Sequence, residues 1–287
     1  MTLFTRKTTT RFMVAALTFA TLMSGAACGS GSSSAKDDTK SGAITEETIN
    51  PGTLTIATGD PAYTPYVEDN DPESGKGYEA AVAYAVAEKM GFSKDKVKWT
   101  RTSFDAAIAP GTKDFDMNIQ QFSITSERKN AVDFTPSYYN STQSLVVHKD
   151  SKYASAKSLS ELKDAKIGAM VGSTSYTVAQ DKLKKDVQTF NDNATLAQAL
   201  DTNQIDALVI DTPSAYNIVE SKQVKEGAVL GQIKGSEDPE GMGIVLPKDS
   251  KLTEAASKAV TELDKDGTLK KLQEQWLHEY TSTPTLG

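Results

Sequence analysis

The sequence of 287 residues contains one cysteine, Cys28, and two histidines, His148 and His278. A single cysteine cannot form an internal disulfide, so no disulfide framework stabilises the fold. Neither histidine lies in a polar cluster, and the Cys and His spacings that are typical of metal sites are missing. The sequence therefore predicts no metal and no other cofactor.

The chain also lacks an excess of basic residues, because 31 Lys and Arg stand against 38 Asp and Glu. Nucleic-acid binding depends on clustered cations, so this balance argues against a nucleic-acid partner. The only long apolar run, residues 12–23, is shorter than the ~20 residues of a membrane-spanning helix. It follows Arg6, Lys7 and Arg11, as the apolar part of an export signal follows its cations. We expect residues 1–27 to be a signal peptide, whose removal takes away these three cations and lowers the formal charge from −7 to −10.

Cys28 directly follows the small residues 24–27, and this position resembles the lipidated cysteine of a bacterial lipobox. Gly25 stands where that motif usually has leucine, so a soluble secreted protein cut near the same place is the alternative. Residues 29–42 are rich in Gly and Ser and then charged, which is the composition of a flexible tether. We expect residues 28–50 to be a lipidated cysteine and tether that hold the exported protein at the outer face of the cytoplasmic membrane. The lipid would be its only membrane attachment.

The remaining globular part, residues 51–280, is long enough for two lobes of ~100 residues each. Short β-type runs alternate with helical stretches along it, which predicts an α/β fold with mainly parallel sheets. The expected strands are 54–58, 97–99, 117–119, 143–148, 166–171, 187–190, 207–210 and 242–246. The expected helices are 77–90, 104–109, 176–183, 196–202, 252–263 and 269–278.

Polar loops follow four of these strands, at residues 59–63, 120–128, 172–175 and 211–213. Ligands of open α/β sheets bind at the carboxyl ends of the strands, where loops lead into helix N-termini. We therefore expect these four loops to carry the ligand-binding groups.

Several ordered segments resemble the polar amino-acid-binding proteins of ABC importers, solute-binding family 3. The segments are ATGDPAYTPY (57–66), GYEAAVAYAVAEKMGF (77–92), SFDAAIAP (103–110), QFSITSERKNAVDFTPSYY (121–139) and KIGAMVGSTSYTVA (166–179). The resemblance covers essentially all of residues 51–280 and implies the two-lobed type II periplasmic-binding-protein fold, with a ligand cleft between the lobes. The first lobe would contain residues 51–140 and 239–280, and the second would contain residues 141–238. Two crossover strands, near residues 139–143 and 233–239, would act as hinges.

The resemblance also implies how an amino-acid backbone is bound. Arg128 would hold the ligand's α-carboxylate with its planar guanidinium, and Ser123 would bind the same end of the ligand. Ser173 and Thr174, at a helix start in the second lobe, would close on that carboxylate. Asp211 would accept the α-ammonium group.

The ligand's side chain would lie between Tyr63 and Phe104, which exclude water from the polar contacts. Gln120 and Gln121 replace the small hydroxyl residues that the family often has, so at least one amide is expected to contact the ligand. Asp60 stands where some binders of basic amino acids hold a cation, and it also occurs in members with neutral ligands. The resemblance therefore implies a polar or charged L-amino acid and leaves glutamine-like, basic and acidic ligands open.

Simpler structural roles exist for several of these residues. Arg128 could form a surface ion-pair network with Glu127 and Asp133. Thr174 and Asp211 could each be helix N-caps, and Phe104 could be a core residue. The structure can distinguish these alternatives.

The function implied is capture of an amino acid by hinge closure and delivery to an ABC permease and its ATPase, by a monomer that is not an enzyme. One alternative is a ligand-sensing or adhesin-type surface protein with the same fold. Another is a dehydratase-type enzyme on this fold, for which the sequence offers no nucleophile or metal motif.

Overall fold

The computed structural model describes residues 44–183, 186–277, 280 and 282–287. The chain divides into two units, Met1–Ala35 and Lys36–Gly287, and all elements below belong to the second unit. The predicted signal peptide 1–27, Cys28, the first part of the tether and His278 lie outside the described residues.

The first sheet has five strands in the order β2-β1-β3-β10-β4. Their bounds are β1 Leu54–Thr58, β2 Val97–Arg101, β3 Met117–Asn118, β4 Val132–Tyr139 and β10 Met242–Pro247. Strand β1 runs parallel to β2 and β3, whereas β10 is antiparallel to β3 and β4. The carboxyl ends of β1, β2 and β3 therefore lie at one edge of the sheet.

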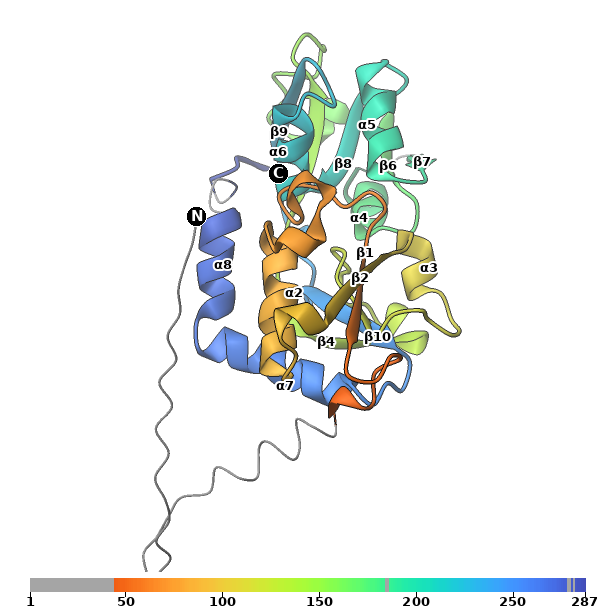
Figure 1. Cartoon of the computed structure of the whole chain (residues 1–287). Helices are drawn as coiled ribbons and strands as arrows, with labels where there is room; N and C mark the ends of the chain where they lie inside the picture. The colour runs from red at the N-terminus through yellow and green to blue at the C-terminus, as the bar shows by residue number, and fades with distance from the viewer. Residues whose placement is uncertain (1–43, 184–185, 278–279, 281) are drawn as a thin grey trace, which may run out of the picture. The chain divides into compact units, whose positions relative to one another are not determined.

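One face of this sheet is covered by α2 (Tyr78–Lys89), α7 (Thr253–Lys265) and α8 (Thr268–Trp276), which lie together in Figure 1. Helix α2 is rich in Ala and buries Val82 and Val86 against Leu54 and Ile56 of β1. The opposite face packs around Phe115 and Phe122, next to the short helix α3 (Phe104–Ile108). Apolar residues on both faces of a sheet fix its strands firmly, so the loops at its edge start from rigid supports.

The second sheet has six strands in the order β11-β9-β5-β8-β6-β7. Their bounds are β5 Gln143–His148, β6 Ile167–Met170, β7 Gln188–Phe190, β8 Ala207–Asp211, β9 Gly227–Ile233 and β11 Thr285–Leu286. Strands β6, β7 and β8 are parallel, so their carboxyl ends also meet at one edge.

Alternate residues of the second sheet face opposite sides, as the period of two in a strand requires. Leu145 and Val147 of β5 pack in the core beside α4 (Thr174–Leu183), whereas Val146 packs in the other core. That second core contains residues of α5 (Asn193–Asp201) and α6 (Thr212–Glu220). Five short 3-10 helices complete the described elements at Glu68–Asn70, Pro72–Ser74, Lys94–Lys96, Arg128–Asn130 and Leu159–Leu162.

The chain passes between the sheets in three places. Residues 140–142 join β4 to β5, and residues 234–241 join β9 to β10. The end of the chain makes the third passage, because β11 follows α8 and pairs in parallel with β9. Local sequence patterns predict neither β11 nor the strands β4 and β9.

Residues 48 and 49, at the end of the predicted tether, pack against the first sheet. Thr48 is buried, and the Ile49 N–H donates a 2.8 Å hydrogen bond to the Asp116 carboxylate. The same carboxylate accepts a 2.7 Å bond from the Thr55 N–H of β1. Asp116 therefore fastens residues just before β1 to the first sheet, a contact that the local composition cannot reveal.

Candidate functional site

Loops at the carboxyl ends of the parallel strands carry the candidate site. From the first sheet come residues 59–63 after β1, residues 103–104 after β2 and residues 120–123 after β3. From the second sheet come residues 171–174 after β6, residues 191–193 after β7 and Asp211 at the end of β8. Both sheets therefore present the strand ends at which α/β proteins bind ligands.

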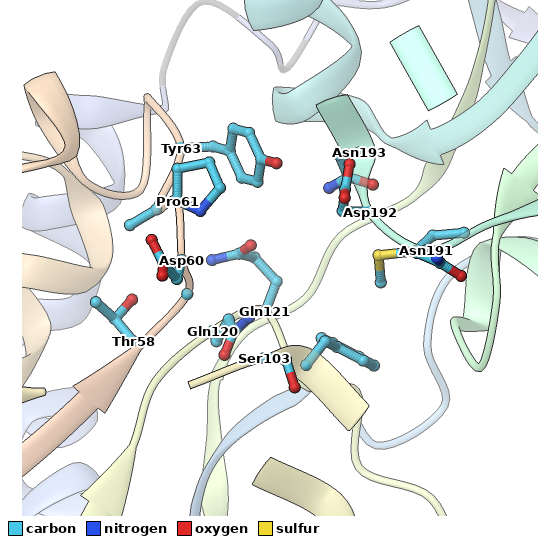
Figure 2. Close-up of a pocket in the computed structure, with 14 residues that line it drawn as sticks. Thr58, Asp60, Pro61, Tyr63, Ser103, Gln120, Gln121, Asn191, Asp192 and Asn193 are labelled. Carbon is cyan, nitrogen blue, oxygen red and sulfur yellow. The ribbon is translucent and has the colours of Figure 1, made fainter. Parts of the chain in front are cut away.

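Loops of both sheets line a cavity of about 240 Å³. Its lining is formed by Thr58, Gly59, Asp60, Pro61, Ala62, Tyr63, Ser103, Phe104, Gln120, Gln121, Met170, Asn191, Asp192 and Asn193. In Figure 2, Pro61 and Tyr63 lie on one side, and Asn191, Asp192 and Asn193 lie on the other, with Gln121 between them. Five residues of the predicted site therefore share one pocket: Asp60, Tyr63, Phe104, Gln120 and Gln121.

The pocket contains acidic and amide groups and, among the described residues that line it, no basic side chain. Asp60 contributes a carboxylate from the first sheet, and Asp192 contributes one from the second. Desolvation raises the pKa of Tyr63 to about 12, and the charge of Asp192 acts in the same direction. Tyr63 therefore stays protonated at neutral pH and can donate a hydrogen bond.

Gln121 is held by a buried carboxylate beneath the pocket. Its N–H donates a 2.7 Å hydrogen bond to Glu79 Oε1, and its side-chain Nε2 donates to Glu79 Oε2. Glu79 also accepts a hydrogen bond from the Tyr138 hydroxyl. Burial raises the pKa of Glu79 to about 7, against the opposing effect of these hydrogen bonds. Because Glu79 takes the amide donor of Gln121, this side chain offers a ligand mainly its carbonyl oxygen.

Gln120 is the better placed of the two amides for contact with a ligand. Its Oε1 is buried and has no hydrogen-bond partner among the described residues. An unpaired buried acceptor costs free energy, so a ligand that donates a hydrogen bond here would be favoured. A side chain on Gly59 would come within 3.0 Å of Gln120 Nε2, so the glycine leaves the space that this amide uses.

Arg128 lies outside this pocket, in a second group of polar residues. It is 8% exposed, and desolvation lowers its pKa. Its Nη1 donates to the Ser123 carbonyl at 2.8 Å and its Nη2 donates to the Gly172 carbonyl of the second sheet at 2.9 Å. The guanidinium also lies 5.2 Å from the centre of the Phe104 ring. These contacts place Arg128 between loops of the two sheets.

The structure does not support the alternative of a surface ion-pair network. Arg128 forms no ion pair with Glu127 or Asp133 within the described part of the chain, and Asp133 instead pairs with Lys248 at 3.2 Å. Phe104 connects the two groups of residues, because it lines the pocket, faces Arg128 and packs 4.6 Å from Phe122. Phe104 is thus both a pocket residue and a neighbour of the core.

Ser123 and Thr174 connect the sheets through their hydroxyl groups, which lie 3.0 Å apart. The Ser123 hydroxyl also donates a 2.7 Å hydrogen bond to Asp238, on the second passage between the sheets. Thr174 is the first residue of α4 and is not its cap. The cap is Ser173, whose hydroxyl oxygen accepts a 3.1 Å bond from the Tyr176 N–H. Thr174 is therefore available for contacts across the sheets.

Asp211 precedes α6, but its side chain makes no capping hydrogen bond. Its Oδ1 accepts a 2.7 Å hydrogen bond from Gln143 Nε2, and Gln143 Oε1 accepts one from Ser175 at 2.6 Å. Desolvation and, as a smaller cause, the nearby charge of Asp238 raise the pKa of Asp211 to about 7. A cationic partner would stabilise the charged form of this buried carboxyl group.

Several residues of the site are missing from the sequence analysis. Asn191, Asp192 and Asn193 follow a predicted strand, so the strand-exit rule that selected the other loops could have found them. Glu79 and Asp238 carry no such signal, because their roles depend on contacts with residues far along the chain.

Membrane-spanning helices and metal-binding clusters are both missing from the part of the chain that the structure describes. No helix within residues 44–183 or 186–277 is long and apolar enough to cross a membrane. In the same part of the chain, no three His, Cys, Asp or Glu residues come together as a metal ion would require.

Comparison with known proteins identifies the family. Residues 54–279 match the bacterial extracellular solute-binding proteins, family 3. The L-cystine-binding protein TcyJ of Escherichia coli (strain K12) is 31% identical over 230 residues, which cover 78% of this chain and 82% of TcyJ. The arginine-binding extracellular protein ArtP of Bacillus subtilis (strain 168) is 28% identical, with 75% and 82% covered.

Among solved structures, an ancestral arginine-binding protein bound to arginine superimposes with a TM-score of 0.64 at 33% identity, with 79% of this chain and 98% of that chain covered. The predicted type II periplasmic-binding fold is confirmed by this likeness. These relatives are named as binding proteins rather than enzymes, in agreement with the prediction of a non-enzymatic role. The chain belongs to family 3 of the bacterial extracellular solute-binding proteins.

Proposed function

We propose that the protein captures a polar or charged L-amino acid between its two lobes and releases it to an ABC importer. The observation that carries this proposal is the approach of Arg128 and Ser123 from the first sheet to Gly172 and Thr174 from the second. A guanidinium has five N–H donors, and the two described bonds of Arg128 use two of them. Arg128 can therefore receive an α-carboxylate bidentately, with hydroxyl donors beside it.

Asp211 is the proposed partner of the α-ammonium group. It lies in the electrostatic field of both Arg128 and Asp238, and its raised pKa is that of a charge poorly compensated within the protein. An ammonium ion would compensate that charge and lower the pKa again. The ligand backbone would thus meet a cation and an anion fixed by different sheets.

The acidic pocket favours a ligand whose side chain carries a cation or hydrogen-bond donors. Asp60 and Asp192 supply carboxylates, Gln120 supplies an unpaired acceptor, and Tyr63 and Phe104 supply apolar ring faces. An acidic side chain would be repelled by the two carboxylates. Relatives named for arginine and for cystine are compatible with such a pocket.

Closure of the lobes would supply the signal for delivery. The ligand would bind loops of the first lobe and then draw Thr174 and Asp211 of the second lobe toward it, so the closed form gains contacts that the open form lacks. The connections 140–142 and 234–241 would act as the hinges. Arg128 reaches the Gly172 carbonyl at 2.9 Å, which is the kind of contact that closure would create or adjust.

The remaining proposals concern the cellular setting. The protein would be a lipoprotein anchored through Cys28 at the outer face of the cytoplasmic membrane, would act as a monomer, and would deliver its ligand to a permease and its ATPase. The family is described as extracellular, which supports export. The anchor can be tested in cells that produce the protein or its Cys28→Ser variant, by labelling these cells with a fatty-acid analogue.

A thermal-shift panel of the twenty L-amino acids with ornithine and cystine would test the binding function on the purified protein. A ligand at 100 times its Kd should stabilise the folded state by about 2.7 kcal/mol. We expect one or a few cationic or donor-rich amino acids to raise the melting temperature. A response to none of them, before and after refolding from denaturant to remove any carried ligand, would contradict the proposal.

A further inference from the structure

Asp238 is a buried carboxylate at the meeting point of the two sheets. It is 5% exposed and lies on the connection 234–241, which is also the second proposed hinge. Its backbone carbonyl accepts a 3.1 Å hydrogen bond from Asn140 Nδ2, on the other connection, and a 3.1 Å bond from the Gly241 N–H. The two connections are thus joined at Asp238, and its side chain projects from a fixed backbone.

The carboxylate of Asp238 engages groups from both lobes. Its Oδ2 accepts a 2.7 Å bond from the Ser123 hydroxyl of the first lobe, and the Ser123 oxygen lies 3.0 Å from the Thr174 hydroxyl of the second. Burial raises the pKa of Asp238, and the hydrogen bond from Ser123 and the charge of Arg128 act against this by favouring the charged form. Asp238 thus lies with Ser123, Thr174 and Arg128, the groups that the proposed function assigns to the carboxylate of the ligand.

We propose that Asp238 is an internal carboxylate that competes with the carboxylate of the ligand and holds the lobes together when no ligand is bound. The inference rests on the proposed function, in which Ser123, Thr174 and Arg128 bind the α-carboxylate. Each hydroxyl has one proton to donate, so Ser123 cannot donate to both carboxylates at once, and the Thr174 hydroxyl is already paired with Ser123. Two carboxylates near one guanidinium also repel each other. Ligand binding therefore requires Asp238 to give up these contacts.

Such competition has a defined consequence for affinity. When internal contacts occupy the binding groups, only a fraction of the protein molecules is in the state that accepts ligand. The apparent affinity is then the intrinsic affinity multiplied by that fraction. Removing the competing charge should raise the affinity. The opposite role, in which Asp238 binds the ammonium group of the ligand, predicts a loss of affinity for the same variant.

The first test is calorimetric titration of the wild-type protein, Asp238→Asn and Asp238→Ala with the amino acid that gives the largest thermal shift. We expect both variants to bind about fivefold or more tightly than wild type, the lower end of typical coupling between sites. The matched control is Glu237→Gln, which changes an exposed carboxylate of the same connection and should leave affinity unchanged. Unchanged or weaker binding by Asp238→Asn overturns the proposal.

The second test needs no ligand and separates this inference from the proposed function. Spin labels are placed on cysteines introduced at the exposed positions Lys98 and Glu226, one in each lobe, in a Cys28→Ser background. Distances measured by pulsed electron resonance should lengthen, or spread to longer values, when Asp238 is changed to Asn or Ala. An unchanged distance distribution in both variants would overturn the internal contact between the lobes, whether or not any amino acid binds. If the wild type binds no amino acid but the distances change as expected, the proposed function and the competition between carboxylates are rejected. The contact of Asp238 between the lobes is then retained.

Discussion

The carboxylate of Glu79 accepts two hydrogen bonds from Gln121, one from the backbone N–H at 2.7 Å and one from the side-chain amide. Gln121 has a φ of +52°, a left-handed conformation that residues other than glycine seldom adopt. Glu79 is fully buried in the first turn of α2. A helix of the first lobe therefore fixes the conformation of a pocket residue that lies 42 positions further along the chain.

This relationship predicts that Glu79→Gln destabilises the protein. The amide has one acceptor oxygen in place of two, so one of the donors from Gln121 or Tyr138 loses its partner in a buried place. We expect a loss of about 1–3 kcal/mol in the free energy of unfolding, measured by urea denaturation. Glu88→Gln changes an exposed glutamate of the same helix and should shift the midpoint little. Equal effects of the two variants would contradict the role given to Glu79.

The raised pKa of Glu79 makes a second, pH-dependent prediction. Its pKa is about 7 in the folded protein against an ordinary value of 4.5, so the folded chain holds this proton more tightly than the unfolded chain. Protonation therefore favours folding below pH 4.5, and this contribution is lost as the pH rises through 7. The stability of the wild type relative to Glu79→Gln should fall with pH across this window, by about 1.4 kcal/mol per pH unit at most. Parallel pH profiles of the two proteins would disprove the shift.

Replacement of Arg128 should remove amino-acid binding and leave the fold intact. Truncating one partner of a buried, hydrogen-bonded charge pair costs about 2–5 kcal/mol of binding free energy. We expect losses of this size by calorimetry for Arg128→Ala and smaller losses for Arg128→Lys, whose ammonium group cannot bind a carboxylate in a planar, bidentate manner. Lys129→Ala, at the next position, removes a cation that pairs with Glu240 at the surface and is the control. Unaltered affinity in Arg128→Ala would refute the assignment of the carboxylate.

The variant Asp192→Asn tests the charge of Asp192 separately from its role as a helix cap. Asp192 caps α5 by accepting a 2.7 Å bond from the Thr195 N–H, and asparagine caps helices about as well as aspartate. The variant should therefore keep its melting temperature and lose about tenfold in affinity for a cationic ligand, or about 1.4 kcal/mol. Asp69→Asn, an exposed position outside the pocket, is the charge-matched control. A fall in affinity for neutral and cationic ligands alike would point to a structural effect instead.

Gly77→Ala should destabilise the start of α2. A Cβ at Gly77 would lie 2.5 Å from the Tyr66 carbonyl oxygen, and the residue has a φ of +97°. Steric clash adds to backbone strain, so we expect a loss of at least about 2 kcal/mol in thermal or urea unfolding. Gly52 has a φ of +80°, and a Cβ at this position would have no atom within 4 Å, so Gly52→Ala isolates the strain alone. Similar losses in both variants would rule out a contribution from the clash.

Local sequence signals located most elements of the fold. Apolar periodicity located α2, α7 and β5 because those segments bury a regular pattern of side chains. Strand β4 was not predicted because its sequence, VDFTPSYY, contains a proline, which weakens the strand signal. The proline is tolerated because β4 lies at the edge of the sheet. Strand β11 is only two residues long and depends on β9, so no local pattern could reveal it.

The candidate site was likewise predicted only where local sequence signals exist. Family segments and strand-exit loops pointed to Asp60, Tyr63 and Gln120, which line the pocket together. They could not show that Arg128 and the pocket form separate groups linked by Phe104, because this depends on how the two sheets meet. The roles of Glu79 and Asp238 likewise arise from pairings between segments 42 and 115 residues apart.

The position of β10 and β11 in the sheets also determines when the chain can fold. Strand β10 lies between β3 and β4 in the first sheet, and β11 forms an edge of the second, yet each follows all the other strands of its sheet in the sequence. Neither sheet can be completed until its last strand has been synthesised, because long-range pairing must wait for its partner strand. During synthesis, the first sheet therefore lacks a strand until β10 has emerged, and the second lacks one until β11 has emerged.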